Sequence, residues 1–275
     1  REACNYLKSK GREIIEIPVD SEGILNFREL ENVLKRYSKE TLLVSVMHAN
    51  NIIGTIQNIE KIGNLCTYFK IPFHADAAQT LGKIPIDVKK MNLSLLSASG
   101  HKVGAPKGIG FLYKKENLQI TPLIFGGGQE RNLRSGTENV PAIVSFAEAL
   151  KLAKKTNEKA IKNYRDKIIT ELVAAGGTLN GSQENRLFNN IHMTIPNGIE
   201  SDFLVSFLSQ RGIYVSTGSA CDSKKEIEDH VLKAIGVKEK KFGSSIRISL
   251  PQDCTEKDVN IFLVNMKSAL AKLSP

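Results

Sequence analysis

The sequence predicts an α/β protein with a mostly parallel sheet, followed by a smaller α+β layer. Three apolar runs, 42–47, 71–76 and 93–96, are short, continuous and end in polar residues, which is typical of buried strands. The segment between the first two, 59–69, has apolar residues at helical spacing. Strands that alternate with helices favour a parallel sheet, and 275 residues suffice for a large and a small domain. We expect the large domain over 1–150, and a connector helix and small domain over 151–275.

The first half is predicted to alternate strands and helices. An apolar run at 14–19 indicates a strand, and Leu30, Val33 and Leu34 indicate a helix over 27–37. The strand at 42–47, the helix at 59–69 and the strands at 71–76 and 93–96 follow, with a further strand at 108–113. This order predicts helices on both faces of the sheet.

The second half of the sequence has a different pattern of residues. A glycine-rich loop at 126–130 leads to polar residues and Pro141, which suits the first turn of a helix. Helical periodicity continues to about residue 175, with a break near Lys155. Strands are then expected at 190–195, 213–215 and 245–250, with a helix over 201–210. Thr255 and Asp258 form a capping box that starts the last helix.

Composition narrows the class of protein. Apolar residues make up 41% of the chain, and no apolar run approaches the roughly 18 residues of a membrane span. The four cysteines are scattered without a CxxC pair, so free thiols in a reducing compartment are expected. The net charge of +9 lies in short lysine clusters, which favours a solvated surface over a nucleic-acid interface. Because the chain starts without methionine or signal peptide, we expect a fragment or processed product.

Two strand ends carry residues suited to one cofactor. Asp76 ends one predicted strand, and Lys102 follows the end of the next. A buried carboxylate near a desolvated amine is what pyridoxal 5'-phosphate needs, because the carboxylate keeps the pyridine nitrogen protonated and the lysine binds the aldehyde as a Schiff base. Ser99 and His101 are donors suited to its phosphate, and Gln79 to its ring hydroxyl. The alternatives are a helix cap at Asp76 and a solvated strand exit at Lys102.

Two more residues are chemical candidates. Arg247, on an alternating strand, is either a surface residue or a bidentate clamp for a carboxylate. Cys221 lies in a small polar loop, where a reactive thiol is more credible than at Cys4, Cys66 or Cys254. The sequence contains no zinc-type ligand cluster, no Walker loop and no Ser-His-Asp arrangement, so no metal is expected.

Six ordered motifs together resemble one family. They lie at 47–51, 74–79, 97–102, 126–139, 218–221 and 245–249. The chain resembles the cysteine desulfurases of the NifS and IscS type, pyridoxal-phosphate enzymes of the class V aminotransferase group with the type I fold. The resemblance runs from Arg1 to the last helix.

The resemblance implies a role for each matched residue. Lys102 holds the cofactor, Asp76 pairs with its pyridine nitrogen, Gln79 faces the ring oxygen, and Ser99 and His101 hold the phosphate. Thr137 reaches the phosphate of the neighbouring subunit, which implies a homodimer with shared sites. Asn51 and Arg247 anchor the carboxylate of the substrate, L-cysteine, with L-alanine as product. Cys221 takes the sulfur as a persulfide and passes it to an acceptor for iron-sulfur cluster assembly or tRNA thiolation.

The sequence also departs from the family in two ways. An N-terminal part with a phosphate-binding loop and a ring-stacking histidine is not present, so this stretch alone is not expected to be active. Ile52 stands where the family has a glutamate. The alternative functions are a selenocysteine lyase or related class V enzyme, and a truncated, non-catalytic paralogue that binds partners. The expected location is the cytoplasm, with an organelle as the alternative.

Overall fold

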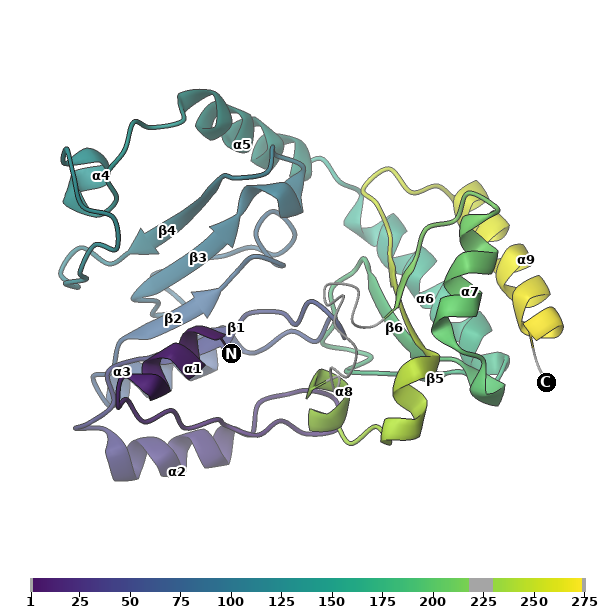
Figure 1. Cartoon of the computed structure of the whole chain (residues 1–275), viewed down its shortest axis with the longest axis horizontal. Coiled ribbons are helices and arrows are strands. Elements are labelled where there is room, and N and C mark those ends of the chain that lie inside the picture. Colours follow the sequence, from purple (N-terminus) through teal and green to yellow (C-terminus); the bar gives the residue numbers. More distant parts are fainter. Residues whose placement is uncertain (1, 218–229, 274–275) are drawn as a thin grey trace.

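The computed structural model contains two four-stranded sheets with separate cores (Figure 1). It describes residues 2–217 and 230–273, apart from the side chain of residue 197. The first sheet has the order β1-β2-β3-β4 and the second the order β5-β6-β8-β7. The two sheets lie towards opposite ends of the long axis of the molecule.

The first sheet is mostly parallel, as predicted. Its strands are β1 (Val44–Met47), β2 (Phe73–Asp76), β3 (Leu95–Ser99) and β4 (Gly110–Lys114). The first three strands run parallel, and β4 pairs with β3 in the antiparallel sense. The chain turns between β3 and β4 through a short 3-10 helix, η1 (Gly100–Val103). The strand predicted at 93–96 corresponds to β3, which begins slightly later in the chain, at Leu95.

Two helices predicted from periodicity pack against this sheet. They are α2 (Phe27–Tyr37) and α3 (Ile59–Tyr68), and their buried side chains meet Phe73 and Ala75 of β2 in one core. Each begins at an asparagine, Asn26 or Asn58, whose side chain accepts a hydrogen bond from a backbone amide of the first turn. Local capping and burial thus agree with the periodicity.

Two expectations for this half are wrong. Residues 14–19 form no regular strand and make only a single bridge, between Val19 and Leu25, because no described strand lies beside them. Helices cover one face of the sheet, and Met47 and Leu112 on the other face stay 38% and 51% exposed. The connection from β2 to β3 does not cover that other face, because its side chains Ile86, Val88 and Met91 pack in the same core as α2 and α3. An unpredicted helix, α1 (Glu2–Ser9), buries no side chain.

The connection to the second sheet is helical. A short helix, α4 (Gln129–Asn132), precedes α5 (Val140–Ala153), in which Pro141 occupies the first turn. The helix α6 (Glu158–Ala174) follows after the break predicted near Lys155. The side chains of α5 pack with η1 of the first sheet, whereas those of α6 join the core of the second sheet.

The second sheet is antiparallel. It contains β5 (Thr178–Leu179), β6 (Asn190–Thr194), β7 (Ser216–Thr217) and β8 (Ser245–Ser249), with 3-10 helices η2 (Pro196–Gly198) and η3 (Glu239–Ser244). Its other helices are α7 (Ser201–Ser209), α8 (His230–Ala234) and α9 (Glu256–Leu273). The strand predicted at 213–215 lies at 216–217 instead. The capping box is confirmed, since Thr255 and Asp258 exchange hydrogen bonds.

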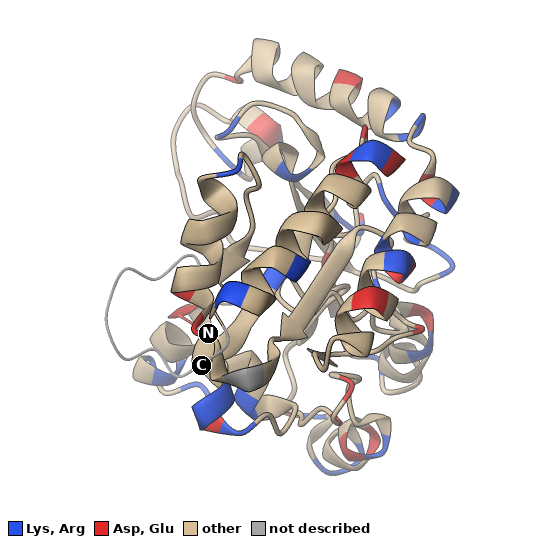
Figure 2. Ribbon diagram, turned by 90° about the vertical axis from the view of Figure 1, so that its right-hand side faces the viewer, with Lys and Arg blue, Asp and Glu red and all other residues tan. Residues whose placement is uncertain are grey.

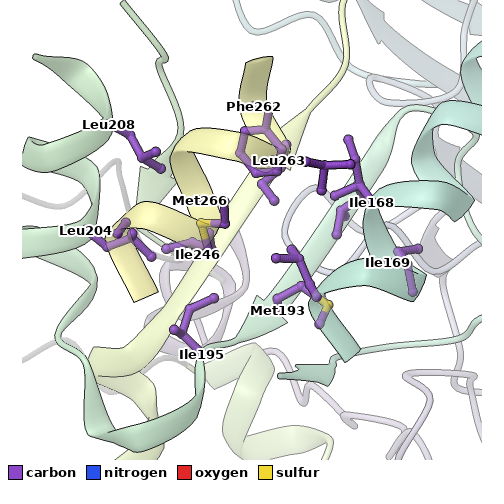
Figure 3. Close-up of a cluster of buried hydrophobic side chains, with 14 of the residues drawn as sticks. Ile168, Ile169, Met193, Ile195, Leu204, Leu208, Ile246, Phe262, Leu263 and Met266 are labelled. Atoms are coloured by element: carbon purple, nitrogen blue, oxygen red, sulfur yellow. The ribbon is translucent and has the colours of Figure 1, made fainter. Parts of the chain in front are cut away.

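The core of the second sheet is dry and closely packed. Alternate residues of β6 and β8, such as Met193 and Ile246, point towards α6, α7 and α9 and meet Leu204 and Met266 (Figure 3). The other face of the same strands carries polar residues, among them Asn190, His192 and Arg247. This division places a polar surface of the second sheet on the side away from its helices.

The surface of the molecule is mixed in charge. In the view of Figure 2, basic and acidic positions are interspersed along the helices. No helix among residues 2–217 and 230–273 is both long enough and apolar enough to span a membrane.

Candidate functional site

The carboxyl ends of β2 and β3 bring four candidate residues to one edge of the first sheet. Asp76 is the last residue of β2 and pairs in register with Ser97, two residues before Ser99 at the end of β3. The η1 turn, with His101 and Lys102, begins directly after Ser99. These residues, which lie within 26 positions of one another in the chain, share one strand edge because the strands are parallel.

The η1 turn holds the donors predicted for a phosphate. The Ser99 Oγ and His101 Nδ1 atoms lie 2.7 Å apart, at hydrogen-bond distance. Both residues line an open hollow of about 510 Å³, whose other wall is the segment 107–110. Gly100 allows this turn, because a Cβ atom there would lie 2.7 Å from the Ile109 side chain.

The structure corrects the expected burial of the two charged groups. Lys102 is exposed, and Asp76 is half-buried, with its Oδ1 atom 2.8 Å from the Ala78 amide that donates to it. The less exposed amine near Lys102 is that of Lys83, which is half-buried, and desolvation and the charge of Lys102 lower its pKa to about 8. A lone sequence cannot show this, because exposure at a strand end depends on what packs above it.

Gln79 and His48 complete this edge. Gln79 is half-buried in the turn that follows Asp76. The backbone amide of His48 donates to the Asp76 carbonyl at 2.9 Å, and its Nδ1 atom lies 3.1 Å from the Thr80 hydroxyl. Burial lowers the pKa of His48 to about 4, so its ring is neutral near pH 7. Sequence reasoning assigned no role to His48, although it lies in a motif.

A second cluster joins the two sheets. An Arg247 guanidinium nitrogen donates to the Asn51 carbonyl at 3.3 Å, and the other terminal nitrogen lies 3.5 Å from the Ser216 hydroxyl. The two residues predicted to bind one carboxylate are therefore neighbours, although 196 positions separate them in the chain. The Asn50 side chain accepts from the amides of Ile52 and Ile53 and stabilises the turn that presents Asn51.

The remaining two candidates are not joined to these clusters by the described residues. Thr137 is exposed in the loop between α4 and α5. Cys221 lies outside the described residues.

The fold and these motifs match known proteins. The class V aminotransferase family model matches residues 2–262. A cysteine desulfurase IscS of Methanosarcina thermophila is 42% identical over 274 residues, which are 98% of this chain and 67% of that protein. One of Dictyoglomus turgidum is 40% identical over 277 residues, 99% of this chain and 69% of that protein. This chain thus spans about two thirds of their length.

A solved structure agrees. A NifS-like protein superimposes with a TM-score of 0.90 at 38% identity, over 99% of this chain and 72% of its own. The type I fold predicted for the chain is confirmed by this match. The chain belongs to the class V aminotransferase family and, within it, to the cysteine desulfurases, which use pyridoxal 5'-phosphate to remove sulfur from L-cysteine.

Proposed function

We propose that this cysteine desulfurase divides its chemistry between the two clusters, with the cofactor at the ends of β2 and β3 and the substrate carboxylate at Asn51 and Arg247. The observation that carries the proposal is the convergence of Asp76, Ser99, His101 and Lys102 at one sheet edge.

The residues at this edge fit the cofactor. The hollow beside η1 offers the Ser99 hydroxyl and His101 ring to a phosphate, Asp76 offers a carboxylate oxygen to the pyridine nitrogen, and Gln79 an amide to the ring hydroxyl. Lys102, exposed on η1, is free to reach an aldehyde above the strand ends. When bound, the cofactor supplies an electron sink that weakens the bond between carbon and sulfur in L-cysteine.

The substrate is held by its carboxylate and loses its sulfur to a thiol. The Arg247 guanidinium offers paired donors to the carboxylate, and Asn51 an amide beside it. The Cys221 thiol then takes the sulfur: L-cysteine and the thiol give L-alanine and a persulfide, as one carbon-sulfur bond breaks and one sulfur-sulfur bond forms. The persulfide passes to an acceptor protein for iron-sulfur cluster assembly or tRNA thiolation in the cytoplasm.

The proposal includes a homodimer. The segment before α4 and the start of α5 expose large apolar side chains, with Leu123 95%, Phe125 75% and Val144 62% exposed. Such a patch next to the loop that carries Thr137 suits a second copy, in which Thr137 would reach the phosphate of the partner site. Sedimentation equilibrium measures this directly, and a strictly monomeric protein would contradict it.

The proposal also divides the chain near residue 150. The α5 helix packs with the first sheet and α6 with the second, so the boundary falls in the four-residue break between them, 154–157. Limited proteolysis should therefore cut this segment before either sheet; earlier cleavage within a sheet would contradict it.

The experiment that tests the cofactor site is an absorbance titration. Addition of pyridoxal 5'-phosphate to the full-length protein should give a band of the lysine-bound cofactor, and Lys102→Ala should abolish it. Lys107→Ala is the matched control, because Lys107 lines the same hollow and should leave the band in place. Persistence of the band in Lys102→Ala would refute the assignment. Cys221→Ser should retain the band yet form no persulfide; persulfide in that variant would refute the role of Cys221.

A further inference from the structure

A buried arginine, Arg186, lies where the second sheet meets the first. Its side chain belongs to the loop between β5 and β6 and is 4% exposed. All three of its nitrogens donate to oxygens: Nε to the Ser182 carbonyl at 2.8 Å, one terminal nitrogen to Asn190 Oδ1 at 3.3 Å, and the other to the Asn180 carbonyl. None of these acceptors is charged.

The loop that carries Arg186 is docked on the turn that follows Asn51. The Leu187 amide donates to the Gly54 carbonyl at 3.0 Å, and the Ile56 amide to the Asn185 carbonyl at 2.8 Å. Thr55 and Arg186 themselves form an antiparallel bridge. Arg186 therefore stabilises the surface on which the 51–54 turn rests.

Asn190 connects the guanidinium to this turn. While its Oδ1 atom accepts from Arg186, its Nδ2 atom donates to the Ile52 carbonyl at 3.2 Å. The contact with the turn is very close, because a Cβ atom at Gly54 would lie 2.3 Å from Asn190 Oδ1. A shift of Asn190 would therefore shift the turn and Asn51 at its start.

A second series of contacts connects Arg186 to β8, the strand that carries Arg247. Asn180, whose carbonyl Arg186 binds, donates through its side chain to His192 Nδ1 at 3.0 Å. His192 on β6 is the register partner of Arg247 on β8. Burial, together with the charges of Arg186 and Arg247, lowers the pKa of His192 to about 3. His192 is therefore neutral near pH 7 and adds no second positive charge beside Arg247.

A buried cation in such a place is costly, which favours a specific role. Among the described residues, no carboxylate lies within ion-pair distance of Arg186. Burial and the charge of Arg165 lower its pKa to about 10. Burial of an ion is unfavourable unless hydrogen bonds and nearby charges offset it; here each guanidinium nitrogen donates one hydrogen bond, and the charges of Asp166 and Glu22 raise the pKa of Arg186 in opposition to burial.

We infer that Arg186 is a positioning residue for the substrate carboxylate: through Asn190 and Asn180 it holds Asn51 and Arg247 at the spacing that one carboxylate requires. The inference rests on the proposed roles of Asn51 and Arg247. Because the carboxylate is bound alike in the ground and transition states, loss of this spacing should raise KM and leave kcat nearly unchanged.

The test is the steady-state kinetics of Arg186→Lys with L-cysteine, measured in the full-length enzyme, together with the affinity for L-alanine from the cofactor absorbance. Lysine keeps the positive charge but lacks the planar guanidinium group with its fixed set of N–H donors. KM and the Kd of L-alanine should each rise about tenfold, with kcat within about twofold. Where Arg186→Lys fails to fold, Asn190→Asp serves instead, because it keeps the acceptor for Arg186 and loses the donor to Ile52.

The control is Leu204→Ala, a cavity in the core of the second sheet that takes part in neither series of contacts. It should lower Tm at least as much as Arg186→Lys without raising KM. Arg186→Lys with lowered Tm and unchanged KM would overturn the inference.

The variant Arg247→Lys separates this inference from the proposed function. If Arg247→Lys keeps the KM of the parent enzyme, the proposed carboxylate anchors are wrong. If Arg247→Lys raises KM and Arg186→Lys does not, only the role of Arg186 is wrong.

Discussion

The candidate cofactor cluster and the buried cluster around Arg186 differ in how the fold builds them. The cluster at the ends of β2 and β3 is open to solvent, and its residues follow adjacent strands of one sheet. The Arg186 cluster, which comprises Asn180, Ser182, Arg186 and Asn190, is buried and joins segments about half the chain apart, as in the hydrogen bond from Asn190 to Ile52, 138 positions away. An exposed side chain of the first, such as that of His101, can be removed with little loss of stability, whereas the polar groups of the second have no access to water and cannot.

The largest expected effect tests this difference directly. Arg186→Met leaves three buried oxygens without donors and should lower the free energy of unfolding by about 3 kcal/mol. His101→Ala, at an exposed residue, should change it by at most about 0.5 kcal/mol. Urea unfolding of both variants measures the contrast, and equal losses of stability would show that the Arg186 cluster is no more constrained than the open site.

Acid should weaken the protein through one histidine of each region. His48 and His192 have folded pKa values of about 4 and about 3, below the ordinary 6.5, so the unfolded chain binds protons that the folded chain excludes. Stability should therefore fall as the pH drops from 6.5 towards 4, by roughly 2 to 3 kcal/mol for each histidine.

Urea unfolding at several pH values checks this for His48→Asn and His192→Asn. Each substitution should flatten the dependence of the free energy of unfolding on pH between 6.5 and 4. In His48→Asn the remaining dependence comes from His192 and should extend to lower pH, because His192 has the lower pKa. If neither variant changes the pH dependence of stability, that dependence comes from other titratable groups.

The smallest effect compares two glycines with left-handed backbones. Gly54→Ala would place a Cβ atom 2.3 Å from Asn190 Oδ1 at φ +75°, whereas Gly108→Ala in the open hollow meets nothing within 4 Å at φ +88°. Both should cost about 1 kcal/mol of backbone strain, and Gly54→Ala about 1 to 2 kcal/mol more from the clash. Thermal unfolding measures the difference, and equal shifts in Tm would contradict close packing at Gly54.

The sequence predicted the parts of the fold that depend on local chemistry. The helices α2 and α3 were predictable because apolar spacing and asparagine caps agree within each segment. The strand at 14–19 was not, because an apolar run becomes a strand only with a partner beside it, and no described strand pairs with it.

The same distinction between local chemistry and tertiary packing applies to the candidate site. By itself, the sequence determined that Asp76, Ser99, His101 and Lys102 share an edge, because parallel strands place their carboxyl ends together. Only the tertiary structure decided that Lys102 is exposed while Lys83 is half-buried, and that Asn51 meets Arg247. It also decided that Arg186 donates to Asn190, whose side chain binds the turn after Asn51. Burial and contacts between distant segments depend on how the two sheets pack, and no local pattern in the chain encodes them.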